Sequence, residues 1–198
     1  MAKFISKLAL LILCITSVVF AENSISATAG AMSYSRASQE YDGWFGSLDL
    51  LTADDRIGTI GFRALYVFPV EFSLDDDFHV SSQLYAFQVI KPIDFRFDLF
   101  NVRLTSGIGP AFQRTSYDYT GEPDIDCFGC SDAEFQNSYL LLSGLLEINR
   151  FIYREKLSFS IGIHYEHFIG DPGARTDVPN PPKLNSAFGL TTGIGWYF

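Results

Sequence analysis

Two histidines and a glutamate lie close together late in the chain, in residues 164–169, which read His-Tyr-Glu-His-Phe-Ile. An imidazole can take a proton from a serine hydroxyl, and a carboxylate can orient that imidazole; together they hydrolyse esters. Ser186 is a candidate nucleophile for His167 if the fold brings the two residues together. The alternative interpretation is that His167 is an interfacial residue that snorkels beside Tyr165.

A second group that could do chemistry is Cys127-Phe128-Gly129-Cys130, in the longest acidic segment of the chain. This spacing suits a disulfide, a redox thiol pair or half of a zinc site. A thioredoxin-type pair needs a helix that begins after the first cysteine, and zinc needs two further ligands that no nearby residue supplies. We therefore predict a disulfide between Cys127 and Cys130 in an exported protein, and no metal or cofactor.

The elements that must position these residues are strands, because apolar residues recur with a period of two. The period is clearest at residues 184–198, where Phe188, Leu190, Ile194, Trp196 and Phe198 alternate with small or polar residues. Outer-membrane barrels combine an apolar outer face, aromatic girdles and a polar interior. The terminal Phe198 with Trp196 and Ile194 resembles the C-terminal signal that the assembly machinery of such barrels recognises.

The same alternation predicts eight strands, joined by short turns at one end of a barrel and by longer segments at the other. The fourth strand begins at Phe78 and its end is ambiguous, because a turn fits either 91–94 or 98–101, and Pro92 inside a strand would require a bulge. The predicted fold is all-β, an eight-stranded antiparallel transmembrane barrel. The first three strands are expected at 24–35, 43–51 and 57–68, and the fifth strand ends at about residue 119. The last three strands are expected at 135–153, 157–169 and 184–198, with longer connecting segments at 36–42, 117–134 and 170–183.

On this register five charged side chains point into the barrel. Eight strands leave a lumen that side chains fill, and buried charges are tolerated there when they are paired. We therefore predict a paired polar core without an open pore. The five residues are Asp49, Arg63, Arg103, Glu147 and Glu166.

Residues 1–21 are predicted to be a cleaved signal peptide, because Lys3 and Lys7 precede the apolar run 8–20 and small residues precede a cleavage site after Ala21. The run is too short to span a bilayer as a helix. Leu13 before Cys14 argues against lipidation. The remaining 22–198 form one domain. Its acidic balance, a net charge of −9 for the whole chain, argues against nucleic-acid binding. The acidic segments are solvated loops or divalent-cation sites.

Residues 162–198 resemble the outer-membrane lipid A 3-O-deacylases, which are small eight-stranded barrels. The stretch 165–168 resembles the approach to that family's catalytic histidine, and Pro179-Asn180 with Asn185-Ser186 resembles the return of its chain. The resemblance implies a histidine that faces the bilayer, where lipid A lies, a serine two residues later and an orienting glutamate. Ile169 stands at the serine position, and no acid follows Asp177. An outward-facing Ser186 paired beside His167 would be a relocated nucleophile.

We predict an integral protein of the bacterial outer membrane, in contact with lipopolysaccharide and the assembly machinery, with a structural or loop-mediated surface role. The alternative is a lipid A 3-O-deacylase-like enzyme, or its degenerate relative, that acts through His167 and Ser186. The absence of the family's serine and glutamate favours the first prediction, because a serine hydrolase without them loses orders of magnitude in rate. The sequence identifies no ligand and leaves the oligomeric state open.

Overall fold

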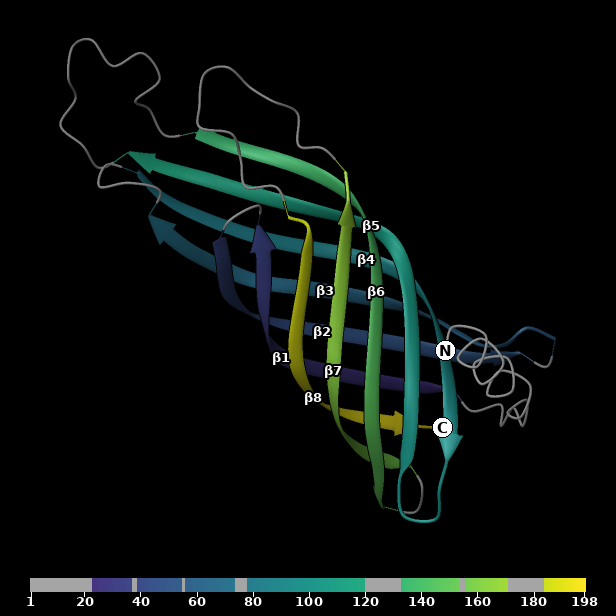
Figure 1. The fold of residues 1–198 in the computed structure, drawn as a ribbon. Helices are drawn as coiled ribbons and strands as arrows, with labels where there is room; N and C mark the ends of the chain where they lie inside the picture. Colours follow the sequence, from purple (N-terminus) through teal and green to yellow (C-terminus); the bar gives the residue numbers. More distant parts are fainter. Residues whose placement is uncertain are drawn as a thin grey trace, which may run out of the picture.

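The computed structural model describes residues 23–36, 39–54, 56–73, 78–119, 133–153, 156–170 and 184–198. Each strand pairs antiparallel with the next, and the last pairs with the first, which closes a barrel (Figure 1). The predicted fold class is confirmed. In the described part of the chain, no helix is long and apolar enough to cross a membrane. The strands are β1 (Ser24–Arg36), β2 (Gln39–Asp54), β3 (Gly58–Ser73), β4 (Phe78–Arg96), β5 (Asn101–Tyr119), β6 (Ala133–Tyr153), β7 (Leu157–Ile169) and β8 (Ser186–Tyr197).

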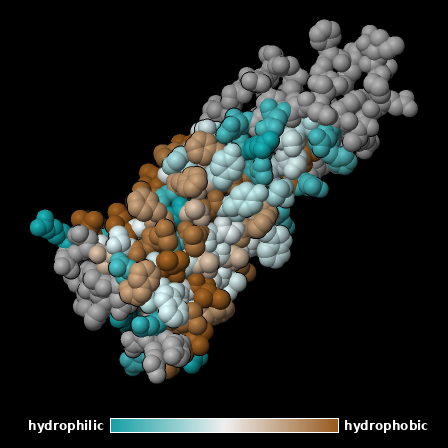
Figure 2. Space-filling model, turned by 180° about the vertical axis from the view of Figure 1, so that it is seen from behind, coloured by the Kyte–Doolittle hydropathy of each residue, from teal (hydrophilic) through white to brown (hydrophobic). Residues whose placement is uncertain are grey.

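The wall of the barrel separates two kinds of side chain. Along β7 and β8, buried and exposed residues alternate from one end of the strand to the other. The exposed set is apolar apart from His167 and Thr192, with Ile161 at 59% and Leu190 at 65% exposure. Figure 2 shows hydrophobic side chains gathered over the wall and hydrophilic ones toward the ends of the barrel. This outer face is suited to contact with lipid. Exposed aromatic residues lie toward both ends of the wall: Trp44, Tyr66 and Phe68 toward one, Phe159, Trp196 and Phe198 toward the other.

The interior is packed with side chains rather than filled by a channel. An apolar cluster occupies the part of the lumen farther from the chain termini. Between this cluster and the end of the barrel that holds the chain termini, the lining of the lumen is polar and charged. Side chains as large as those of Arg63, Phe45 and Tyr117 are less than 2% exposed. The apolar cluster includes Met32, Tyr34, Phe45, Leu65, Val67, Leu84, Tyr139, Leu141 and Phe168.

Strand lengths differ from the prediction where strands continue beyond the apolar band. The longer segment expected at 36–42 is wrong, because β2 already begins at Gln39, and Arg36 pairs with Gln39 in a tight hairpin. Outside the bilayer both faces of a strand contact water, so the alternation that marks a strand in the sequence disappears there. Within the apolar part of the wall, the predicted inward and outward directions of the side chains are confirmed.

The turn after β4 lies at residues 97–100, which settles the ambiguity in favour of the second position. Pro92 lies within β4 and pairs with Thr105 without any shift of register, so the expected bulge at this proline is wrong. The ladder between β3 and β4 ends at the pair of Gly61 and Ile90. Pro92 therefore lies where β4 is paired on one side only, and a proline is tolerated at such an edge.

Candidate functional site

Charged side chains cross the lumen at the level of Arg63. The Arg63 Nε and Nη2 atoms donate hydrogen bonds of 2.7 and 2.6 Å to the two carboxylate oxygens of Asp49. The two residues are direct backbone partners in the β2–β3 ladder, and both are buried. The inward position and the pairing predicted for them are confirmed. In such a bidentate pair the two hydrogen bonds fix the orientation of both side chains, and the opposite charges compensate each other.

Glu166 and His164 lie near this pair, two residues apart on β7, and both are almost inaccessible to solvent. The His164 Nε2 and Glu166 Oε1 atoms are 3.7 Å apart, which is beyond hydrogen-bond distance. Neither Glu166 oxygen accepts a hydrogen bond from a described residue. The imidazole of His164 and the Phe45 ring pack edge to face, with 5.2 Å between their centres. Glu166 thus points inward as predicted, but its carboxylate is not paired as well as that of Asp49. Glu147, also inward, is hydrogen-bonded to Ser160.

Neutral polar side chains link the strands elsewhere in the lumen. Tyr139 donates to Gln113, and Gln113 donates to Ser82, at 2.9 and 2.8 Å. Ser143 donates to the Gln88 side-chain carbonyl at 3.0 Å. These bonds join β4, β5 and β6 across the interior. Together with the buried apolar cluster they block a water-filled passage through the described part of the barrel.

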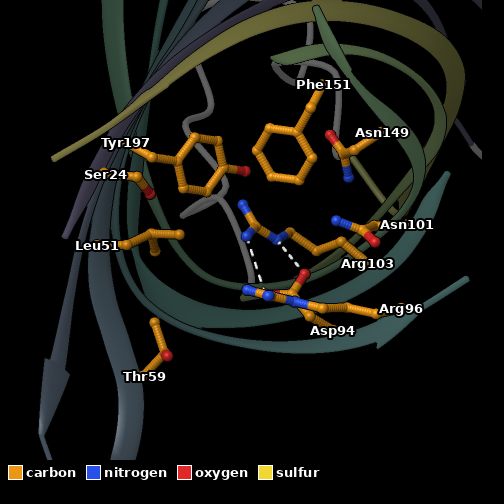
Figure 3. A pocket seen from close by; sticks show the side chains of 10 residues that line it. All are labelled: Ser24, Leu51, Thr59, Asp94, Arg96, Asn101, Arg103, Asn149, Phe151 and Tyr197. Carbon is orange, nitrogen blue, oxygen red and sulfur yellow. Dashed lines mark hydrogen bonds and ion pairs between the residues drawn. The ribbon is translucent and has the colours of Figure 1, made fainter. Parts of the chain in front are cut away.

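The lumen ends, at the side of the chain termini, in a polar pocket of about 20 Å³. Arg103 donates two hydrogen bonds to Asp94, at 2.7 and 2.9 Å, and its guanidinium lies 5.7 Å from the centre of the Tyr197 ring. Figure 3 shows this guanidinium between Asp94 and the rings of Tyr197 and Phe151. The two rings meet edge to face at 5.1 Å. The volume is enough for about one water molecule.

Asp94 and Tyr197 are the residues that sequence reasoning missed here. The sequence places Asp94 in a possible turn, although the residue continues the inward alternation of Gln88 and Pro92 on β4. Tyr197 belongs to the small or polar positions of the last strand, and the alternation alone gives it no partner. Asp94 is the direct backbone partner of Arg103 in the β4–β5 ladder. Tyr197 meets Arg103 because β8 ends at the end of the barrel where β5 begins.

The proposed catalytic residues lie on the outer wall. His167 and Ser186 are direct backbone partners in the β7–β8 ladder, and both face outward, His167 exposed and Ser186 half-buried. No hydrogen bond joins the two side chains among the contacts of the described residues. The partner of His167 on β6 is Leu142, and Glu166 points to the opposite side of the wall. The chain therefore brings the imidazole and the hydroxyl to one place, with no acid beside them among the residues that the structure describes.

Other predicted residues differ in what the structure can say of them. Ala21, Cys127 and Cys130 lie outside the described residues, so signal cleavage and the disulfide stay predictions. Phe198 and Trp196 are exposed at the end of β8, and the Phe198 amide donates to the Asn23 carbonyl at 3.0 Å. Ile194 is exposed on the same face. Among the described residues, no three His, Cys, Asp or Glu side chains gather in a way that could hold a metal ion.

Comparisons with known proteins agree on the fold. No family model and no curated protein matches the chain. Neisserial surface protein A matches in structure with a TM-score of 0.59 and 16% identity, over 89% of this chain and 97% of that chain. A major outer membrane protein from Thermus thermophilus matches with a TM-score of 0.55 and 14% identity, over 89% and 99%. Ail, the attachment invasion locus protein of Yersinia pestis, matches with a TM-score of 0.50 and 15% identity, over 90% of this chain and 99% of that chain.

At such low identity these similarities show the fold alone. That fold is the closed eight-stranded barrel of outer-membrane proteins. The chain is therefore an integral β-barrel of the bacterial outer membrane, with its apolar wall in lipid and its ends in water.

Proposed function

We propose that the protein serves as a structural or surface-presenting barrel and not as a pore. The observation that carries this proposal is the blocked lumen, where the buried pair of Arg63 and Asp49 and the apolar cluster leave no water-filled passage among the described residues. The segments 120–132 and 171–183 connect strands at the end away from the termini, which is the extracellular end in barrels of this kind. They are the parts that a surface role would use.

The absence of a pore is tested by adding the purified, folded protein to planar lipid bilayers. We expect no stepwise conductance, while a porin added at the same concentration gives regular steps. Regular steps from this protein would contradict the proposal. The surface role is tested with an epitope tag inserted in 120–132, which should be detected on intact cells. Detection only after permeabilisation would show that this end does not face the outside.

The second candidate function is removal of an acyl chain from lipid A at the outer wall. It is supported by the direct pairing of His167 with Ser186 on the lipid-facing side, where a substrate in the bilayer could reach both residues. It is weakened because no acid in the described part of the chain lies where it could orient the imidazole. Mass spectra of lipid A from cells with and without the gene decide between the two functions. Loss of one hydroxyacyl chain that depends on the gene would favour the enzyme.

A further inference from the structure

The turn between β4 and β5 exposes an unusual number of apolar side chains. Phe97, Leu99 and Phe100 are 55%, 79% and 40% exposed. The Phe97 and Phe100 rings stack with 5.0 Å between their centres, and the Phe97 amide donates to the Phe100 carbonyl at 3.0 Å, which holds the turn in shape. Turns in water are normally built from polar residues, glycine and proline. This turn lies at the same end of the barrel as the C-terminus (Figure 1).

Exposed cations accompany these apolar residues. Arg150 on β6 faces outward between Ile148 and Ile152, which are 55% and 67% exposed. The β5–β6 ladder ends with Asn101 opposite Asn149, so Arg150 lies beside the position of Phe100. Lys156 is exposed in the turn that follows β6. An arginine that alternates with lipid-facing isoleucines is tolerated where its guanidinium can reach the headgroups of the membrane.

Among the described residues near this surface, the cations outnumber the carboxylates. Asp94 is engaged by Arg103, and Asp98 lies in the turn itself. On β4, Lys91 also faces outward, and its ammonium group donates to the Ile57 carbonyl. The surface thus combines aromatic side chains that prefer the membrane interface with positive charges that favour an anionic headgroup.

We propose that this surface, the periplasmic rim, binds anionic phospholipids of the inner leaflet. The periplasmic rim consists of Phe97, Leu99, Phe100, Arg150, Ile152 and Lys156. Arg150 and Lys156 contact the phosphate, and the apolar side chains of the turn lie at the boundary of the acyl chains. A lipid is favoured over a soluble partner because the apolar residues of the turn continue the lipid-facing wall of β5 from Leu104, and that of β6 on both sides of Arg150, and because the charges complement a phosphate.

The proposal is tested by electron paramagnetic resonance of spin-labelled lipids around the protein in phosphatidylcholine bilayers. The fraction of immobilised phosphatidylglycerol is compared with that of immobilised phosphatidylcholine. We expect a preference for phosphatidylglycerol of about fivefold for each cation at low salt. Arg150→Gln with Lys156→Gln should abolish the preference. Arg114→Gln removes one positive charge at the opposite end and should preserve the preference. Equal binding of both lipids by the wild type, or equal loss in the Arg114 variant, would overturn the proposal.

The position of the turn is tested separately. A nitroxide is attached to Leu99→Cys in a chain that also carries Cys127→Ser and Cys130→Ser, and collision with oxygen is compared with collision with a water-soluble nickel chelate. We expect oxygen to dominate at residue 99 and the chelate to dominate at an Arg114→Cys control. Dominance of the chelate at residue 99 would place the turn in water and overturn the proposal. Migration of unheated protein in detergent gels confirms that each variant is folded.

Discussion

Arg63 and Asp49 are direct cross-strand neighbours inside the barrel, and the guanidinium forms two hydrogen bonds with the carboxylate. The Arg63 side chain is fully inaccessible to solvent, and that of Asp49 nearly so. In this setting each charge depends on the other, because water cannot compensate for a lost partner. The pair therefore both blocks the lumen and limits which substitutions the barrel tolerates.

Removal of one partner should destabilise the barrel strongly. We expect Arg63→Met to lower the free energy of unfolding by about 3–5 kcal/mol, because Asp49 is left charged and buried. Asp49→Leu combined with Arg63→Met should recover most of that loss. Urea unfolding in lipid vesicles measures both variants. If the double variant is as unstable as the single one, the packing of the arginine and not its charge is what matters.

Replacement of Glu166 should have the opposite effect. Its carboxylate is fully buried and accepts no hydrogen bond from any residue that the structure describes, so a neutral amide of the same shape has less to lose on leaving water. We expect Glu166→Gln to raise the free energy of unfolding by about 1 kcal/mol. Glu147→Gln is the matched control, because Glu147 is hydrogen-bonded to Ser160 and should gain nothing. A destabilised Glu166→Gln protein would indicate a partner for this carboxylate, such as ordered water.

The sequence was sufficient to predict the number of strands and their facing, because the bilayer imposes one period of two on every strand that crosses it. It predicted Arg63 and Asp49 as inward residues for the same reason. It could not predict that Arg103 meets Asp94 and Tyr197, since the contact with Tyr197 joins residues about a hundred positions apart and depends on the stagger of the strands. It also failed at the hairpin in which Arg36 pairs with Gln39, because apolar and polar residues do not alternate in the sequence there.

The two cysteines of the segment 120–132 should be joined to each other in the exported protein. Of the three cysteines in the chain, Cys14 lies in the predicted signal peptide, so Cys127 and Cys130 have no competitor after cleavage. Peptide mapping without reductant should find one peptide that carries an internal disulfide. Two free thiols, or bound zinc, would contradict this expectation.

The outer wall yields the last prediction, which concerns His167 and Ser186. The β7–β8 ladder places the imidazole and the hydroxyl side by side in the lipid-facing wall, whereas Glu166, the residue before His167 in the chain, lies inside the barrel and cannot orient that imidazole. The resemblance to lipid A 3-O-deacylases places a serine at position 169. This chain has Ile169 there, an exposed apolar residue that has no nucleophilic group. An imidazole without an orienting acid is a weak base for serine.

We therefore expect no measurable removal of the 3-O-acyl chain of lipid A, or removal that depends on both residues. Wild type, His167→Ala and Ser186→Ala are expressed in a host with defined lipid A, with Thr192→Ala as a matched control elsewhere on the exposed face of β8. Mass spectrometry of lipid A then reports the loss of one hydroxyacyl chain. Deacylation abolished by His167→Ala or Ser186→Ala but not by Thr192→Ala would establish the enzyme at this site. Deacylation that survives both substitutions would mean that the active residues lie elsewhere, since the hydroxyl and the imidazole would then both be dispensable.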